Sequence, residues 1–168
     1  MKRISILALL TSLAIPAVAD AATYRVARVL KDDLQRVGPR TDIAIRVPFR
    51  IGLDYDKGVF GEGSGSKNRY TLEINAADDC GANVCFLAQF QGEKGGEPSF
   101  TREVDLAKGI TGYYKPLSCG GSCSPPMIEW VQGGVLYSIQ AKTGVSGRAR
   151  QRRAMIANAN SAIRARPR

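Results

Sequence analysis

The chain has 168 residues, of which 24 are Lys or Arg, 15 are Asp or Glu, 4 are Cys and none is His. With 44% hydrophobic and 23% charged residues, its composition is that of a globular domain and not of a disordered or collagen-like chain. The absence of His excludes a Ser-His-Asp triad, a Cys-His dyad and any metal site with imidazole ligands.

The N-terminus has the pattern of a secretory signal peptide. Two basic residues are followed by an almost continuous apolar run over 4–18, and small residues suitable for cleavage stand at Ala19 and Ala21. The run is shorter than the roughly 20 residues that a membrane-spanning helix needs, and no second run of that length follows. We therefore expect residues 1–21 to be removed near Ala19 or Ala21. The mature chain, exported to the periplasm or outside the cell, is expected to have no transmembrane segment.

The first two elements after the leader are expected to be a helix and a strand. Apolar residues recur at helical spacing over 24–37, with Thr23 as the expected N-cap and Gly38-Pro39 as the end. Period-two alternation over 43–51 then predicts a strand with Phe49 on its apolar face. Pro48 cannot donate to a ladder, so this strand is expected at a sheet edge or irregular past Val47.

Residues 54–68 are rich in Gly, Ser and charge and predict a loop. Asp54 and Asp56 do not make this loop an EF-hand, because Gly58 stands where the third ligand belongs and Val59 stands at the required Gly. Alternating residues over 70–76 and 86–91 then predict a hairpin.

The cysteines fall in two short, Gly-containing turns. They are Cys80, Cys85, Cys119 and Cys123. An even number of cysteines in an exported chain predicts two disulfides, and we favour the two short-range pairs over a pairing that ties the turns together. A redox or metal site is disfavoured, because neither spacing is C-x-x-C and few other ligands accompany them.

The second half continues with strands and ends in a helix. After a polar loop over 92–99, short strands are expected at 104–106, 110–115, 127–132 and 135–141, the last two joined by a tight turn at Gly133-Gly134. Four residues of this last hairpin are expected in the core: Trp130, Val135, Tyr137 and Ile139. An apolar stripe then predicts a C-terminal helix that Ser146 could cap, formed by Met155, Ile156, Ala159, Ala162 and Ile163.

This order of elements predicts an α+β domain: an antiparallel sheet of about seven strands flanked by an N-terminal and a C-terminal helix. Residues 22–147 would form the body of the domain, and residues 148–168 a basic helix that packs on it.

The excess positive charge lies at the C-terminus. Residues 148–168 hold seven Arg and no acid, whereas residues 20–147 hold 15 basic and 15 acidic residues. Four of the arginines cluster at the start of the last helix: Arg148, Arg150, Arg152 and Arg153. Because a helix N-terminus disfavours cations, we expect this cluster to bind an external anion: an anionic lipid, an envelope polymer or an acidic protein. The alternative is that it pairs with the domain's own acids. Nucleic acid is not expected, since no aromatic residues are interleaved.

The motif Cys119-Gly120-Gly121-Ser122-Cys123-Ser124-Pro125-Pro126 precedes a hairpin with Trp130, Gly133-Gly134 and Tyr137. This stretch resembles a family of small, uncharacterised secreted bacterial proteins. It is also loosely similar to the β-rich domain of some bacterial anti-sigma regulators, which resembles the half-barrel of periplasmic lipoprotein carriers. The resemblance implies a fold and no activity.

We therefore expect an exported, non-catalytic envelope protein that acts by binding, with no cofactor, metal or catalytic residues. One alternative is a carrier or sensor of an apolar or lipidated ligand in the concave face of the sheet, lined by Phe86, Phe90, Trp130, Tyr137 and the apolar stripe of the last helix. We favour the simpler expectation that these residues form the closed core of the domain. A weaker alternative is a carboxylate-dependent hydrolase, but the adjacent pairs Asp32-Asp33 and Asp78-Asp79 do not predict a cleft.

Overall fold

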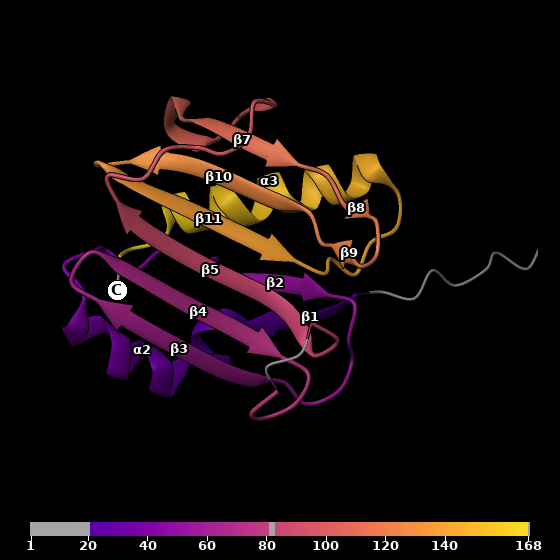
Figure 1. Cartoon of the computed structure of the whole chain (residues 1–168), viewed down its shortest axis with the longest axis horizontal. Coiled ribbons are helices and arrows are strands. Elements are labelled where there is room, and N and C mark those ends of the chain that lie inside the picture. Colours follow the sequence, from indigo (N-terminus) through magenta and orange to yellow (C-terminus); the bar gives the residue numbers. More distant parts are fainter. Residues whose placement is uncertain (1–20, 81–82, 168) are drawn as a thin grey trace, which may run out of the picture.

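The computed structural model describes residues 21–80 and 83–167. The predicted signal peptide, apart from Ala21, lies outside the described residues. The α+β class is confirmed: seven antiparallel strands form one sheet, with helices on one of its faces (Figure 1). In spatial order, the strands are β3 (Phe60–Ser66), β4 (Arg69–Asn75), β5 (Phe86–Lys94), β11 (Val135–Ala141), β10 (Met127–Gln132), β7 (Thr111–Lys115) and β6 (Glu103–Asp105).

The remaining elements are short, apart from the C-terminal helix. Two small antiparallel pairs join β1 (Ala22–Arg25) to β2 (Arg50–Leu53) and β8 (Ser118–Cys119) to β9 (Cys123–Ser124). The helices are α1 (Val26–Val29), α2 (Lys31–Val37) and α3 (Arg148–Arg164), with 3-10 turns η1 (Gly38–Arg40) and η2 (Ala107–Gly109). In Figure 1, α3 lies behind β10 and β11, and α2 lies against β3.

The sheet has one apolar and one polar face because its strands are in register. On the apolar face, Leu72 of β4 stands opposite Phe90 of β5, which stands opposite Ile139 of β11, and all three are fully buried. The apolar side of α3 covers this face with Met155, Ala159, Ala162 and Ile163, each without exposed area. The predicted core residues Trp130, Val135, Tyr137 and Ile139 are all buried there. The opposite face carries Glu, Gln, Ser and Thr and is not covered by α2 or α3.

The predicted strand over 43–51 is wrong in most of its length, since ladder pairing begins only at Arg50. Ile43, Ile45 and Val47 are buried as the alternation indicated, but the segment crosses the apolar face without joining the sheet. Two tyrosine hydroxyls supply its backbone partners instead. The Arg46 N–H donates to the Tyr70 hydroxyl (3.1 Å), and the Tyr137 hydroxyl donates to the Ala44 carbonyl (2.9 Å).

The loop predicted over 54–68 is wrong over residues 60–66, which form the edge strand β3. Its alternate glycines lie under α2. A Cβ at Gly65 would stand 2.7 Å from Cγ1 of Val37, and one at Gly63 would stand 2.7 Å from Cδ2 of Leu72 and 3.1 Å from Cβ of Asp33. Glycine in this strand therefore permits the close approach of the helix and does not mark a flexible segment.

Both predicted helix caps are wrong. Residues 22–25 form β1, so the first helix begins at Val26 after Arg25 and has no side-chain cap. The last helix begins after Gly147, whose φ of 86° is open to glycine, and it too lacks a side-chain cap. Ser146 instead accepts a hydrogen bond from the Arg150 guanidinium (3.4 Å).

The other strands lie close to their predicted positions, and β5 continues through Gly92 to Lys94, where a loop was expected. Gly133 and Gly134, with φ of 62° and 73°, make the tight turn between β10 and β11. The favoured disulfides are confirmed, Cys80 with Cys85 and Cys119 with Cys123, and no cysteine is free.

The contact between α2 and β3 can be tested by Gly65→Ala. The new methyl would collide with Val37, so we expect a loss of about 1–3 kcal/mol in the free energy of unfolding, measured by urea denaturation. Gly58→Ala is the control, because nothing lies within 4 Å of a Cβ at that position. Equal stability of the two variants would show that α2 does not need the glycine.

The contribution of the Tyr70 hydroxyl to stability can be tested by measuring how the free energy of unfolding depends on pH. Burial raises the pKa of Tyr70, and burial likewise raises that of Tyr137, above the usual value of about 10. The unfolded chain therefore ionises first, so the stability due to these groups is complete below about pH 10 and is lost above it.

Tyr70→Phe should make this alkaline loss shallower. At pH 7 it should cost about 1–3 kcal/mol, because the Arg46 N–H loses its acceptor. Denaturation series at pH 7 to 11 measure both effects, with Tyr113→Phe on the polar face as the control. An unchanged slope above pH 10 would contradict the assignment.

Candidate functional site

The predicted arginine cluster occupies the first two turns of α3. Arg148, Arg150 and Arg153 are exposed, and no acidic residue stands in the first turn. The helix N-terminus therefore carries its own partial positive charge next to three cationic side chains. Helix stability alone does not favour this arrangement.

Arg152 differs from the other three members of the cluster because it points toward the sheet. It is half-buried, and its Nε has no hydrogen-bond partner. The Tyr114 hydroxyl on β7 is also buried without a partner, while the Arg102 guanidinium lies 5.9 Å from the Tyr114 ring centre. Burial raises the pKa of Tyr114, and the charges of Arg102 and Arg152 oppose this rise. The structure thus divides the predicted cluster into one inward and three outward side chains.

The arginines of α3 have no carboxylate partner among residues 21–80 and 83–167. The two ion pairs found in this part of the chain join Arg36 to Asp33 and Arg69 to Glu93. The expected alternative, pairing of the cluster with the domain's own acids, is therefore not seen in the described residues. The positive charges of Arg148, Arg150, Arg153 and Arg164 are left facing solvent.

The exposed side of α3 forms a stripe along the whole helix. Arg150, Arg153, Ala157 and Arg164 are exposed at spacings of three, four and seven residues, which place them on one face. Beside the C-terminal half of this stripe lies a wide depression of about 790 Å³. It is lined by Phe49, Ala157, Asn160, Ser161, Arg164, Ala165, Arg166 and Pro167.

The sequence pattern placed Phe49 on the apolar face of a strand, but in the structure its side chain is exposed to solvent. It is 58% exposed, and its N–H donates to the Ser161 hydroxyl (3.0 Å), which holds it against α3. The guanidinium groups of Arg25 and Arg50 lie 5.5 and 5.7 Å from its ring centre. An exposed aromatic ring surrounded by cations thus continues the arginine stripe. We call the exposed residues Phe49, Arg150, Arg153, Ala157 and Arg164 the basic face.

Three of the four aromatic residues that the carrier alternative would place along an apolar groove lie in the core, as the pattern of the last hairpin predicts for Trp130 and Tyr137. Phe90 and Trp130 have no exposed area and Tyr137 has 2%, and Trp130 stacks on Tyr137 with ring centres 5.5 Å apart. Phe86 is half-buried and points to the polar face of the sheet. A β-bulge between Ile74 and Asn75 shifts the register there and separates Phe86 from Ala88 and Phe90.

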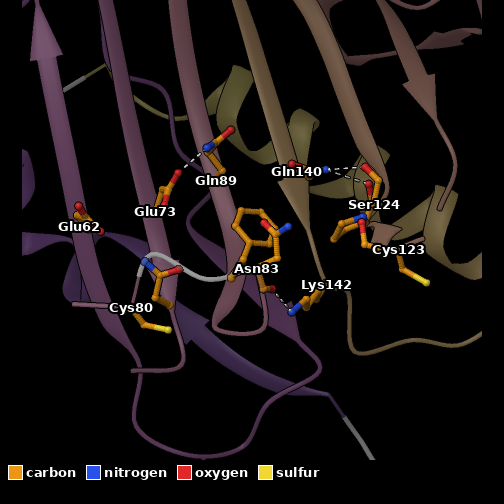
Figure 2. Close-up of a pocket in the computed structure, with 13 residues that line it drawn as sticks. Glu62, Glu73, Cys80, Asn83, Gln89, Cys123, Ser124, Gln140 and Lys142 are labelled. Carbon is orange, nitrogen blue, oxygen red and sulfur yellow. Dashed lines mark hydrogen bonds between the residues drawn. The ribbon is translucent and has the colours of Figure 1, made fainter. Parts of the chain in front are cut away.

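A cavity of about 400 Å³ lies on the polar face of the sheet, and the sequence pattern did not predict it. It is lined by Glu62, Glu73, Asn75, Cys80, Asn83, Phe86, Gln89, Ser122, Cys123, Ser124, Pro125, Gln140 and Lys142. Figure 2 shows Glu62, Glu73, Gln89 and Gln140 on neighbouring strands, with Cys80 below the first two and Cys123 on the side of Gln140. Once 60–66 is recognised as a strand, the alternation of Glu62 and Ser64 with glycines is the signal that places Glu62 on the polar face.

The carboxylates considered for catalysis do not converge. Asp33 is buried and paired with Arg36, whose Nη1 also donates to the Gly63 carbonyl (2.6 Å). Asp78 and Asp79 are exposed before the first disulfide turn. Glu129 is 3% exposed and accepts hydrogen bonds from the N–H and hydroxyl of Ser99 (2.7 and 3.2 Å). Glu62 shares the polar cavity with Glu73, and it shares a smaller pocket of about 220 Å³ with Asp78 and Asp79.

The two disulfides are typical of a protein that matures in an oxidising, exported compartment. Within residues 21–80 and 83–167, none of the helices combines the length and apolarity needed to cross a bilayer. Comparison of the chain with protein-family models, with curated proteins and with solved structures gave no match.

Proposed function

We propose that this chain is an exported, non-catalytic protein of the cell envelope that binds an anionic membrane surface through the basic face. The observation that carries this proposal is the absence of any carboxylate partner for the arginines of α3 in the described part of the chain. A surface of anionic headgroups would supply the missing counter-charge.

Phe49 favours a lipid surface over a purely polar polyanion. An aromatic ring and arginine side chains on one surface match the two layers of a membrane interface, because the ring enters the acyl boundary while the guanidinium groups stay among the headgroups. Phe49 is held beside Arg164 by its hydrogen bond to Ser161. A polar envelope polymer would leave the exposed ring without a favourable contact.

The position of α3 supports binding of the whole domain, not of an unfolded tail. The buried side of the helix is fixed to β10 and β11, so its exposed side is presented rigidly. Each arginine near an anionic membrane contributes about 1 kcal/mol, so three of them account for roughly 3 kcal/mol, or about a hundredfold in affinity.

Vesicle co-sedimentation tests the proposal. The protein without its leader should bind vesicles containing phosphatidylglycerol but not those of phosphatidylcholine alone, and salt should weaken the binding. The triple variant Arg150→Ala, Arg153→Ala, Arg164→Ala should lose about a hundredfold in affinity at low salt. Equal binding to both vesicles, or binding insensitive to salt, would contradict the proposal.

Matched controls separate the basic face from overall charge and hydrophobicity. Arg40→Ala, Lys57→Ala, Lys67→Ala removes the same charge from exposed positions elsewhere and should have a much smaller effect. Phe49→Ala should weaken binding further, whereas Phe60→Ala, which removes a 43% exposed ring on β3, should not. If the Arg40, Lys57 and Lys67 variant weakens binding as much as the α3 variant does, net charge and not the basic face is responsible for the binding.

Export has its own test. We expect the native product to have lost residues 1–19 or 1–21 and to contain no free thiol, because both pairs of cysteines oxidise after translocation. Intact mass before and after reduction and alkylation measures both features. A product that retains Met1 and has four reactive thiols would contradict export.

A further inference from the structure

The polar cavity lies on the polar face of the sheet, shares no residue with the basic face and has a different chemistry. Its floor is one row of the sheet, in which Glu62 of β3 stands opposite Glu73 of β4, Glu73 opposite Gln89 of β5, and Gln89 opposite Gln140 of β11. Three spacings of about 4.8 Å make this row about 14 Å long. The cavity volume of about 400 Å³ lies within the range of small-molecule sites, about 300–1,000 Å³.

The donor groups of Gln89, Gln140 and Lys142 in the cavity are engaged within the protein. The Gln89 amide donates to Glu73 (2.5 Å), and the Gln140 amide donates to the Ser124 hydroxyl and the Pro125 carbonyl (both 3.2 Å). The Lys142 ammonium donates to the carbonyls of Asn83 and Val84 (3.1 and 3.2 Å). These bonds fix the side chains before any ligand arrives (Figure 2).

What remains free along the floor is a row of acceptors. A carboxylate and a carbonyl can only accept, so the contacts of Gln89 and Gln140 determine that their NH₂ groups face Glu73 and Pro125. Their side-chain oxygens and the Glu62 carboxylate have no hydrogen-bond partner among the described residues. A complementary ligand must therefore present several donors spread along the row.

The two glutamates specify the charge of that ligand. Like charges directly opposite on neighbouring strands are unfavourable, and neither Glu62 nor Glu73 has an ion-pair partner in the described part of the chain. A ligand ammonium between them would relieve this repulsion. Phe86, turned into the cavity by the bulge, offers a flat apolar surface to the C–H face of a sugar ring.

We propose that this cavity binds a saccharide that carries hydroxyl groups and a free amino group, with the ammonium at Glu62 and Glu73 and the hydroxyls along Gln89 and Gln140. The walls include Cys80 and Asn83 on one side and Ser122, Cys123, Ser124 and Pro125 on the other. The site is independent of the membrane-binding proposal, because it shares no residue with the basic face.

Titration calorimetry and amide NMR with two matched probes test this site on the oxidised protein. The trisaccharide of glucosamine should bind saturably and shift the amide signals of β4, β5 and β11. The trisaccharide of N-acetylglucosamine, which has no ammonium, should bind at least tenfold more weakly. Absence of saturable binding, or equal affinity for both probes, would overturn the proposal.

Variants locate the binding. Glu62→Gln, Glu73→Gln keeps the side-chain size and should weaken the glucosamine probe at least tenfold, with thermal melts verifying the fold. Glu103→Gln, Asp105→Asn removes the same number of charges from exposed positions on β6, at the far edge of the sheet, and should leave affinity unchanged. Equal loss in both variants would indicate non-specific attraction and overturn the assignment. The triple arginine variant of α3 should retain the sugar, so failure of either proposal is distinguishable from failure of the other.

Discussion

The hydrogen bonds of two buried tyrosine hydroxyls connect the sheet to a segment of the chain that does not pair with any of its strands. Tyr70 and Tyr137 stand on β4 and β11, and each reaches the backbone of the segment 43–49 that crosses the apolar face. Without them, the polar backbone of that segment would lie in the core with unmet hydrogen bonds, which is costly. The segment in turn brings Phe49 to the side of α3, so the aromatic member of the basic face depends on these two hydroxyls.

The register of the sheet accounts for both proposed sites. Period-two alternation puts the large apolar residues on the side covered by α2 and α3 and leaves carboxamides and carboxylates on the other. The basic face is the outer surface of the helix that covers the first side, and the polar cavity is built directly on the second. The domain thus presents a cationic surface and an anionic row on opposite sides of one core.

Sequence patterns predicted the elements whose local preference agrees with their final environment. The strands β4, β7, β10 and β11 and the apolar stripe of α3 are of this kind, as are the short-range disulfides. The edge strand β3 was missed because its glycines serve contacts with α2, which lies some 30 residues away in sequence. The segment 43–49 has the alternation of a strand, yet its backbone partners are side chains on distant strands, which no local pattern specifies.

Because local patterns do not specify contacts between distant segments, the sequence predicted only part of each proposed site. The arginine cluster is contiguous in sequence and was visible as composition, although the inward turn of Arg152 was not. The polar cavity needs Glu62, Glu73, Gln89 and Gln140 from four strands, and only the register of the sheet aligns them. A bulge at Asn75 adds Phe86 to this set, and a one-residue shift of that sort is invisible in a single sequence.

The two disulfide turns have a consequence for the life history of the molecule. The floor of the polar cavity belongs to the hydrogen-bonded sheet, whereas the described wall residues next to the two disulfides lie outside the apolar core. The reduced chain would therefore form its sheet and helices before the two disulfides close. For the proposed saccharide site, oxidation would then complete the walls of the cavity after the sheet has formed.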